Sequence, residues 1–176
     1  MNRRRAATMA AAAALAAIAG GGTAWWRGRT PEEDEAAPPK DVWSLSFPKP
    51  QGGTLAMAEL RGRPLLLNFW ATWCAPCVSE MPLLDQFARE RAESGWQVLA
   101  LAIDGIDPVK RFLAERSLHL PVALAGAEGV DLSRSLGNRL GGLPFSVVFD
   151  SAGQAFARNL GAVSPALLAA WVGFSR

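Results

Sequence analysis

Short apolar runs alternate with longer segments of helical periodicity from about Asp41 to the end of the chain. Short apolar runs bounded by turn residues predict buried strands, and apolar residues spaced three and four apart predict helices with one buried face. The predicted strands are residues 65–70, 96–103, 121–124, 145–149 and 154–159, and the predicted helices are residues 77–93, 107–116, 130–136 and a last helix beginning at residue 165. This order predicts an α/β fold in which helical layers enclose a central mixed sheet.

Polar residues and prolines mark the ends of these elements. Pro76 is predicted to occupy the first turn of the first helix, where a missing N–H costs nothing, and Asp107 and Ser164 are predicted caps of later helices. Residues 150–153 have the composition of a hairpin turn. Pro82 lies inside the first predicted helix, and we expect it to kink that helix.

The N-terminus carries arginines at residues 3–5, followed by an uncharged, alanine-rich segment over residues 6–26 that ends in two tryptophans. At about 1.5 Å per helical residue this segment spans roughly the 30 Å of a bilayer's hydrocarbon, and tryptophans favour the interface. We therefore expect residues 1–29 to anchor the chain in a membrane. The alternatives are a signal peptide cleaved near Ala17–Ala19, which leaves a soluble exported protein, or a flexible tail on a cytosolic protein.

Basic residues are concentrated in this N-terminal segment. Five of the 18 Lys and Arg residues precede residue 30, where no acid lies, so the remainder has fewer bases than its 16 acids. Such a balance gives no electrostatic support for binding nucleic acid. Residues 30–40 combine an acidic run with prolines and predict a flexible, solvated linker, which leaves residues 41–176 as one domain.

The two cysteines of the chain, Cys74 and Cys77, directly follow the predicted strand 65–70. A spacing of two residues at the start of a helix lets both sulfurs meet, so the pair can alternate between dithiol and disulfide. Half of a zinc site is one alternative, but no second Cys or His pair accompanies it, and we predict no metal. A purely structural bridge is another, although its loop is too short to stabilise much.

The position of each cysteine predicts its role in thiol chemistry. Cys74 comes before the helix, where unpaired N–H groups and the positive end of the helix dipole stabilise a thiolate. We therefore expect Cys74 to attack a substrate disulfide and Cys77, one turn further, to resolve the mixed disulfide. The single histidine, His119, is expected to be structural or on the surface, because no other metal ligands converge on it.

The run Asn68–Cys77, followed by Glu80 and Pro82 and later by Gly142–Phe145, resembles the thioredoxin superfamily. Within it, residues 42–176 are most similar to the membrane-anchored, extracytoplasmic thiol-disulfide oxidoreductases of the TlpA/ResA type. The resemblance implies a thioredoxin-like three-layer α/β/α fold with a central mixed sheet, here preceded by an N-terminal hydrophobic helix. It implies no cofactor.

The resemblance also assigns residues around the cysteines. Pro144 matches the family's cis-proline, beside which the backbone of Leu143 binds an extended substrate segment; an ordinary trans proline before a strand is the alternative. Trp73, Ala75 and Pro76 complete the predicted substrate surface. Trp73 is expected to cover one side of the sulfurs as an apolar contact surface, and Trp70 is expected in the core.

Two polar residues are predicted to tune the thiols. Glu80 lies three residues after Cys77, and the related reductases carry a tuning glutamate there; a solvated glutamate held by the helix dipole is the alternative. Asn68 stands where cytosolic thioredoxins place a buried aspartate. Because asparagine cannot titrate, it is expected to satisfy a buried hydrogen bond and to leave proton handling to Glu80 or water.

These features predict an exported, periplasmic reductase of protein disulfides, tethered to the inner membrane by residues 6–26. The resemblance implies exported client proteins with disulfides, in cytochrome c maturation or metal-site assembly, and a membrane thiol-electron donor as partners. An exported thiol oxidant is the main alternative, although Ala75 and Pro76 lack the histidine of strongly oxidising relatives. The chain lacks the threonine and the arginine expected at the site of a peroxide-reducing enzyme, which disfavours that activity. The two cysteines disfavour a redox-inactive binding or chaperone module, which has no use for a thiol pair.

Overall fold

The structure, a computed structural model, describes residues 41–174. The predicted anchor or signal peptide and the whole of the predicted linker lie outside the described residues. Within residues 41–174, no helix is both long enough and apolar enough to cross a membrane.

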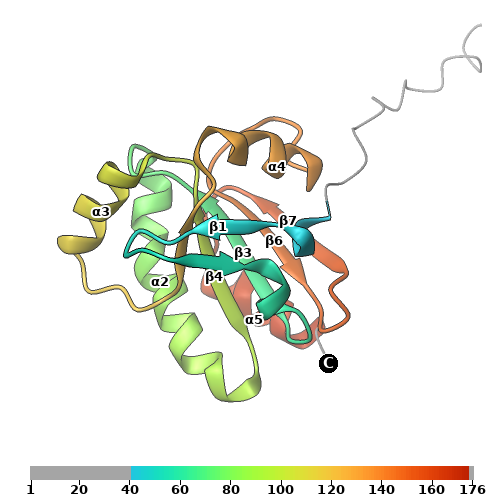
Figure 1. The fold of residues 1–176 in the computed structure, drawn as a ribbon. Helices are drawn as coiled ribbons and strands as arrows, with labels where there is room; N and C mark the ends of the chain where they lie inside the picture. Colours follow the sequence, from blue (N-terminus) through green and yellow to red (C-terminus); the bar gives the residue numbers. More distant parts are fainter. Residues whose placement is uncertain (1–40, 175–176) are drawn as a thin grey trace, which may run out of the picture. The chain divides into compact units, whose positions relative to one another are not determined.

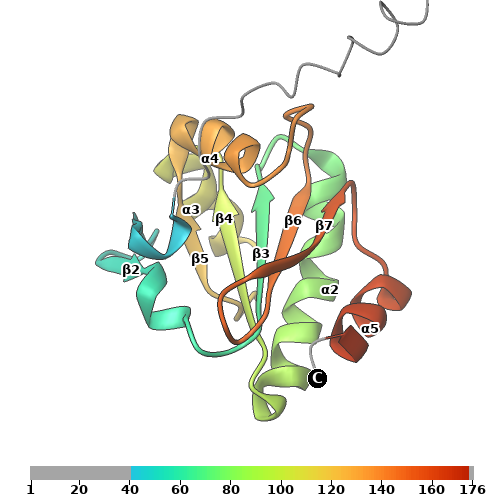
Figure 2. The same ribbon diagram turned by 90° about the vertical axis from the view of Figure 1, so that its right-hand side faces the viewer.

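Five strands form one mixed sheet in the order β5-β4-β3-β6-β7, as Figure 2 shows. Central strand β3 is parallel to β4 and antiparallel to β6. The strands span Leu65–Trp70 (β3), Gln97–Ala102 (β4), Val122–Leu124 (β5), Phe145–Phe149 (β6) and Ala155–Leu160 (β7). The predicted thioredoxin-like α/β fold with a central mixed sheet is confirmed.

Helices cover both faces of this sheet (Figure 1). They span Ala75–Arg91 (α2), Ile106–Ala114 (α3), Gly129–Ser135 (α4) and Pro165–Phe174 (α5), with short 3-10 turns at Ala92–Ser94 (η3) and Gly126–Glu128 (η4). One face packs against α2, α3 and α5. The other face packs against α4 and an N-terminal segment made of η1 (Val42–Ser44), β1 (Ser46–Pro48), β2 (Thr54–Ala56) and η2 (Met57–Leu60).

Strand β3 supplies the centre of both cores, because side chains alternate between the faces of a strand. Leu66 and Trp70 belong to the cluster that contains α2, whereas Leu65 and Phe69 belong to the opposite cluster. All of its residues are buried. Trp70 packs against Phe112 of α3 with 4.9 Å between ring centroids, so the expectation that Trp70 lies in the core is confirmed.

The start of α2 differs from the prediction. The helix begins at Ala75, two residues before the predicted periodic segment, and the prediction that Pro76 lies in its first turn is confirmed. Cys74 is the N-cap, and its sulfur accepts a hydrogen bond from the N–H of Cys77. The helix then continues through Pro82, an exposed residue, as far as Arg91.

The start of α3 also differs, and the prediction that Asp107 caps this helix is wrong. Gly105 is the N-cap, and its N–H donates to the side chain of the preceding Asp104 at 3.0 Å. Asp107 lies inside the first helical turn, where its charge still suits the helix dipole.

Two other predicted local motifs are confirmed. The N–H of Gln154 donates to Asp150 Oδ1 at 2.8 Å in the turn between β6 and β7, and Gly153 adopts a positive φ of 84° there. Ser164 caps α5, because its hydroxyl accepts a hydrogen bond from the N–H of Leu167 at 3.2 Å. The segment of η1, β1, β2 and η2 was not predicted.

Candidate functional site

The two cysteines lie where the central strand β3 passes into α2. They form a disulfide with an Sγ–Sγ distance of 2.06 Å, and the N–H of Cys77 donates to Cys74 Sγ at 3.3 Å. Cys74 is 6% exposed and Cys77 is fully buried. An approaching thiol or disulfide therefore meets Cys74 first, at the N-terminus of a 17-residue helix whose first N–H groups have no partner within the helix.

The loop before the cysteines is held by Asp104, at the end of neighbouring strand β4. Asp104 Oδ2 accepts hydrogen bonds from the N–H of Thr72 at 2.9 Å and from its hydroxyl at 2.6 Å. Oδ1 accepts from the N–H of Gly105 at 3.0 Å. This contact was missed from the sequence, although an aspartate directly after a buried strand beside the cysteine strand is a signal that points to it.

A proline loop from β6 reaches the same end of the sheet. Phe69 of β3 pairs with Phe145 of β6, so Leu143 and Pro144 lie level with the start of the cysteine loop. The peptide bond between Leu143 and Pro144 is cis, which confirms the prediction. Pro144 is buried and Leu143 is half-buried.

The surface around the disulfide is largely apolar. Trp73 is 70% exposed, and Ala75 and Pro76 are exposed beside it. Leu140, in the loop that leads to the cis-proline, is a further exposed apolar side chain, with 83% of its surface accessible. Exposed apolar side chains next to an accessible sulfur are suited to contact an extended polypeptide.

Glu80 is buried one turn beyond Cys77, with 3% of its surface exposed, so the alternative of a solvated glutamate is wrong. Its Oε1 accepts a hydrogen bond from Asn68 Nδ2 at 2.9 Å, and its Oε2 accepts one from the N–H of Val163 at 2.7 Å. Burial raises the pKa of Glu80 above its ordinary value, against the opposing effect of these two hydrogen bonds. A carboxyl group of this kind exchanges a proton more readily near neutral pH than an exposed one.

Asn68 connects Glu80 to β6. Its Nδ2 also donates to the hydroxyl of Ser146 at 3.1 Å, and all three side chains are buried. The expectation that Asn68 makes a buried hydrogen bond is confirmed. Ser146 and Val163 were missed, because each lies far from the cysteines in sequence and only the pairing of β3 with β6 brings Ser146 opposite Asn68.

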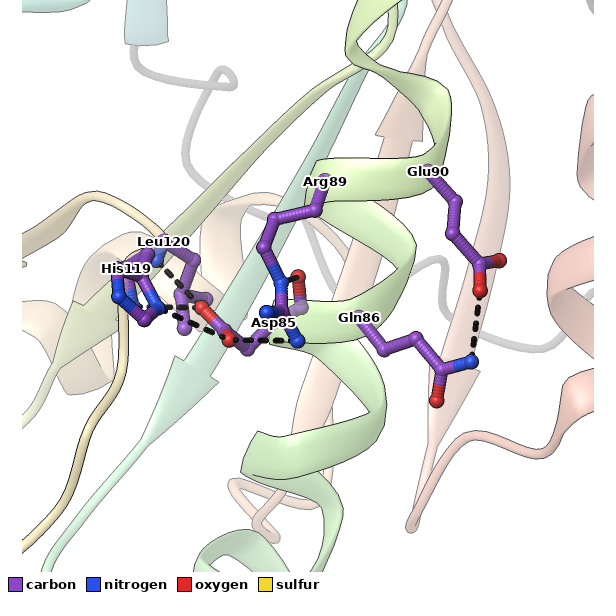
Figure 3. A network of polar contacts seen from close by, with 6 residues as sticks. All are labelled: Asp85, Gln86, Arg89, Glu90, His119 and Leu120. Carbon is purple, nitrogen blue, oxygen red and sulfur yellow. Dashed lines mark hydrogen bonds and ion pairs between the residues drawn. The ribbon is translucent and has the colours of Figure 1, made fainter.

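A second buried carboxylate lies further along α2. Asp85 Oδ1 accepts hydrogen bonds from the N–H groups of His119 at 2.6 Å and Leu120 at 2.8 Å, while Oδ2 lies 3.4 Å from Arg89 and 3.6 Å from the imidazole of His119 (Figure 3). Burial opposes ionisation of Asp85, but these donors outweigh it and hold its pKa below the ordinary value. The His119 side chain is 65% exposed, as expected for a surface residue.

Comparison with known proteins agrees with the cysteine site described above. A family model described as Redoxin matches residues 33–171. The thiol-disulfide oxidoreductase ResA of Bacillus thuringiensis (strain Al Hakam) is 33% identical over 112 residues, which are 63% of this chain and 62% of that protein. ResA of Oceanobacillus iheyensis is 37% identical over 89 residues, which are 50% of this chain and 46% of that protein. The chain therefore spans less than two thirds of these curated relatives.

A solved structure extends the likeness over a larger share of the chain. The thiol:disulfide interchange protein of the thioredoxin family from Chlorobium tepidum superposes with a TM-score of 0.65 and 28% identity, covering 79% of this chain and 97% of that one. The cysteine turn, the cis-proline and the five-stranded sheet agree with this likeness. The chain thus belongs to the Redoxin family and has a thioredoxin-like fold.

Proposed function

We propose that this protein is a thiol-disulfide oxidoreductase that reduces disulfides of exported client proteins through Cys74 and Cys77. One observation supports this most directly: Cys74, which is 6% exposed, caps α2 and is bonded to a fully buried Cys77. The names of the relatives, thiol-disulfide oxidoreductase and thiol:disulfide interchange protein, agree with the proposal.

In the first step of the proposed reaction, the reduced protein presents Cys74 as a thiolate, stabilised by the N-terminus of α2. The thiolate attacks one sulfur of the client disulfide. The client S–S bond breaks, its other sulfur leaves as a thiolate and takes up a proton, and Cys74 is joined to the client in a mixed disulfide. Trp73 and the Leu143 backbone hold the client segment beside Cys74.

In the second step, Cys77 gives up its proton and attacks Cys74 Sγ. The bond between Cys74 and the client breaks, and the second client thiolate leaves and is protonated. The client has gained two electrons and two protons, and the protein holds the disulfide between Cys74 and Cys77. Glu80 is the proposed acceptor of the Cys77 proton, since it is buried on the same side of α2 with a raised pKa.

A dithiol donor must then reduce Cys74 and Cys77 again. We propose a membrane protein that carries thiol electrons, because residues 6–26 are expected to tether the chain to the inner membrane, with the domain in the periplasm. A soluble periplasmic form after signal cleavage is the alternative. The proposed clients are exported proteins of cytochrome c maturation or of metal-site assembly.

Direction and roles are tested with the full-length protein in detergent. It should reduce a chromogenic aromatic disulfide when a dithiol supplies electrons, and Cys74→Ser should abolish this activity because the attacking sulfur is gone. An exported oxidant is the second candidate. If the protein oxidises reduced clients faster than it reduces oxidised ones, the reductase proposal fails.

Client identity is tested by trapping. Cys77→Ser lacks the resolving thiol, so it should accumulate mixed disulfides that release client proteins when a reductant is added. The double variant with Cys74→Ser and Cys77→Ser is the matched control and should trap none. Equal trapping by both variants would assign the captured proteins to non-specific binding.

A further inference from the structure

A buried hydrogen-bond network around Asn68 has one unused acceptor. Asn68 Nδ2 donates to Glu80 Oε1 at 2.9 Å and to Ser146 Oγ at 3.1 Å, which uses both of its hydrogens. Asn68 Oδ1 is buried and has no hydrogen-bond partner among the described residues. An unpaired buried acceptor is costly, so this orientation of the amide needs a reason.

The charge of Glu80 supplies that reason. An ionised carboxylate only accepts hydrogen bonds, so it requires the NH₂ end of the Asn68 amide to face it. A protonated carboxyl group has an O–H to donate on Oε1, and an NH₂ group cannot accept it. A rotation of the amide by about 180° places Oδ1 where Nδ2 now lies, facing Glu80 and Ser146. The Ser146 hydroxyl suits both arrangements, because a hydroxyl accepts or donates.

We propose that Asn68 is a positioning residue whose carboxamide turns over when Glu80 gains a proton and turns back when Glu80 loses it. In one orientation Nδ2 donates to the carboxylate and to the Ser146 hydroxyl. In the other, Oδ1 accepts from the carboxylic acid and from the same hydroxyl. A single asparagine thereby stabilises both forms of Glu80 in a site closed to solvent.

Among residues 41–174, burial and two hydrogen bonds account for the shifted pKa of Glu80, and no charged group contributes to it. Its partners among the described residues are Asn68 from β3 and the N–H of Val163 before α5, and Ser146 of β6 lies beyond Asn68. The titratable groups nearest to Glu80 along the chain are Cys77, Asp85 and Cys74. The cysteines do not titrate while they form the disulfide, and Asp85 accepts hydrogen bonds from the N–H groups of His119 and Leu120. The N–H of Val163 stays on Oε2 in both forms, so the proton is carried on Oε1.

This inference rests on the proposed function only for its place in the reaction. There, the Cys77 thiol transfers its proton to Glu80, giving a Cys77 thiolate and a neutral Glu80, and the amide of Asn68 turns over to bind the neutral acid. The Cys77 thiolate attacks Cys74 Sγ, and the departing client thiolate takes the proton from Glu80. Glu80 is ionised again, and the amide returns to the orientation seen in the structure.

The chain contains a matched control in Asn138. Its Nδ2 also donates twice, to Ser133 Oγ at 3.3 Å and to the carbonyl oxygen of Gly142 at 2.9 Å, and its Oδ1 is likewise buried without a partner among the described residues. A backbone carbonyl accepts but never donates. Asn138 therefore has no state in which a turned amide is favoured, and its orientation should be independent of pH.

The experiment is NMR of the oxidised, full-length protein, with ¹³C and ¹⁵N labels on the Asn and Glu side chains, across a pH titration. Since cysteines joined in a disulfide do not titrate, Glu80 is the group that titrates at this site. As Glu80 becomes protonated, both Nδ2 protons of Asn68 should shift upfield, because they lose their acceptors, and its Cγ should shift downfield. Both shifts should have the midpoint of the Glu80 carboxyl signal. The Asn138 signals should not move.

Two results would overturn the inference. The first is an Asn68 amide whose protons stay downfield, and hence hydrogen-bonded, after Glu80 is protonated. The second is movement of the Asn68 signals in Glu80→Gln, a variant that cannot titrate and should hold the amide in one orientation at every pH. The oxidised protein performs no thiol exchange in this experiment, so a failed reductase assay leaves the result interpretable, and the reverse also holds.

Discussion

Glu80 and Asp85 are two carboxylates on one helix, each 3% exposed, and their environments act on them in opposite directions. The pKa of Glu80 is raised, chiefly by burial. The pKa of Asp85 is lowered, although burial opposes its ionisation too. The same exposed fraction thus does not fix the protonation of a carboxyl group, because the depth at which the carboxylate is buried and the donors around it act on its pKa together.

The donors differ in number and in charge. Glu80 receives one backbone N–H and one amide, and both partners are buried. Asp85 receives two backbone N–H groups and lies beside Arg89, which is 60% exposed, and the imidazole of His119. We infer that Asp85 has a structural role, in which it links α2 to the segment that leads into β5, whereas Glu80 remains able to exchange a proton.

The largest expected effect is on stability, from Asp85→Ala. The substitution leaves the N–H groups of His119 and Leu120 without their acceptor, so the free energy of unfolding of the oxidised protein should fall by about 3 kcal/mol. Urea unfolding measures it. The reduction rate of the folded variant should stay within about twofold of wild type, since Asp85 takes no part in the proposed reaction. A stable Asp85→Ala protein would remove the distinction drawn between the two carboxylates.

The pH dependence of stability should have opposite signs for the two groups. Glu80 has a raised pKa, so between its ordinary value and that raised value the folded state binds more protons than the unfolded state, and its contribution to stability falls as pH rises. Asp85 has a lowered pKa, so its contribution is present above the ordinary value and is lost as pH falls through the lowered one.

These slopes are separated by unfolding wild type, Glu80→Gln and Asp85→Asn over a range of pH. Glu80→Gln should remove the fall of stability with rising pH, and Asp85→Asn should remove part of the loss in acid. Parallel curves for all three proteins would show that neither carboxyl group has a shifted pKa.

A smaller effect is expected from Asp104→Asn. The two oxygens of this carboxylate accept hydrogen bonds from two donors on Thr72 and from the N–H of Gly105, and an asparagine has only one oxygen for them. The variant should lose about 1 kcal/mol of stability and reduce the test disulfide several-fold more slowly, because the loop before Cys74 is less fixed. Thr72→Val removes only the hydroxyl, so its stability and its reduction rate should lie between those of Asp104→Asn and wild type. Full activity in Asp104→Asn argues against this positioning role.

The smallest effect is expected from His119→Ala. The imidazole is 65% exposed and lies 3.6 Å from Asp85, so its loss should cost no more than about 0.5 kcal/mol, whereas the backbone N–H of residue 119 still donates to Asp85. Urea unfolding at neutral pH checks this value. A loss as large as that of Asp85→Ala would mean that the side chain, not the backbone, holds Asp85.

The parts of the site that lie close together in sequence could be predicted. The spacing of Cys74 and Cys77 identifies them as a redox pair, and the apolar run of β3 before them fixes the direction in which the chain enters α2. The identification of Pro144 as cis came from the resemblance, because no local pattern distinguishes it from an ordinary proline.

What could not be predicted depends on tertiary contacts. Ser146 and Asp104 reach the site only through the pairing of β3 with β6 and β4, and Asp85 looks in sequence like one more position on an amphipathic helix. The burial of Glu80 follows from the packing of Val163 against α2, and Val163 lies 83 residues after Glu80 in the chain. Short elements such as β1 and β2 carry too few residues for a periodic pattern.

The most direct test of the central claim is the rate at which Cys77 resolves a preformed mixed disulfide on Cys74, followed in single turnover at neutral pH. Glu80→Gln should slow this step about 100-fold, because the proposed proton acceptor is lost. Asp85→Asn should leave it unchanged. Equal resolution rates in wild type and Glu80→Gln would contradict the role assigned to Glu80.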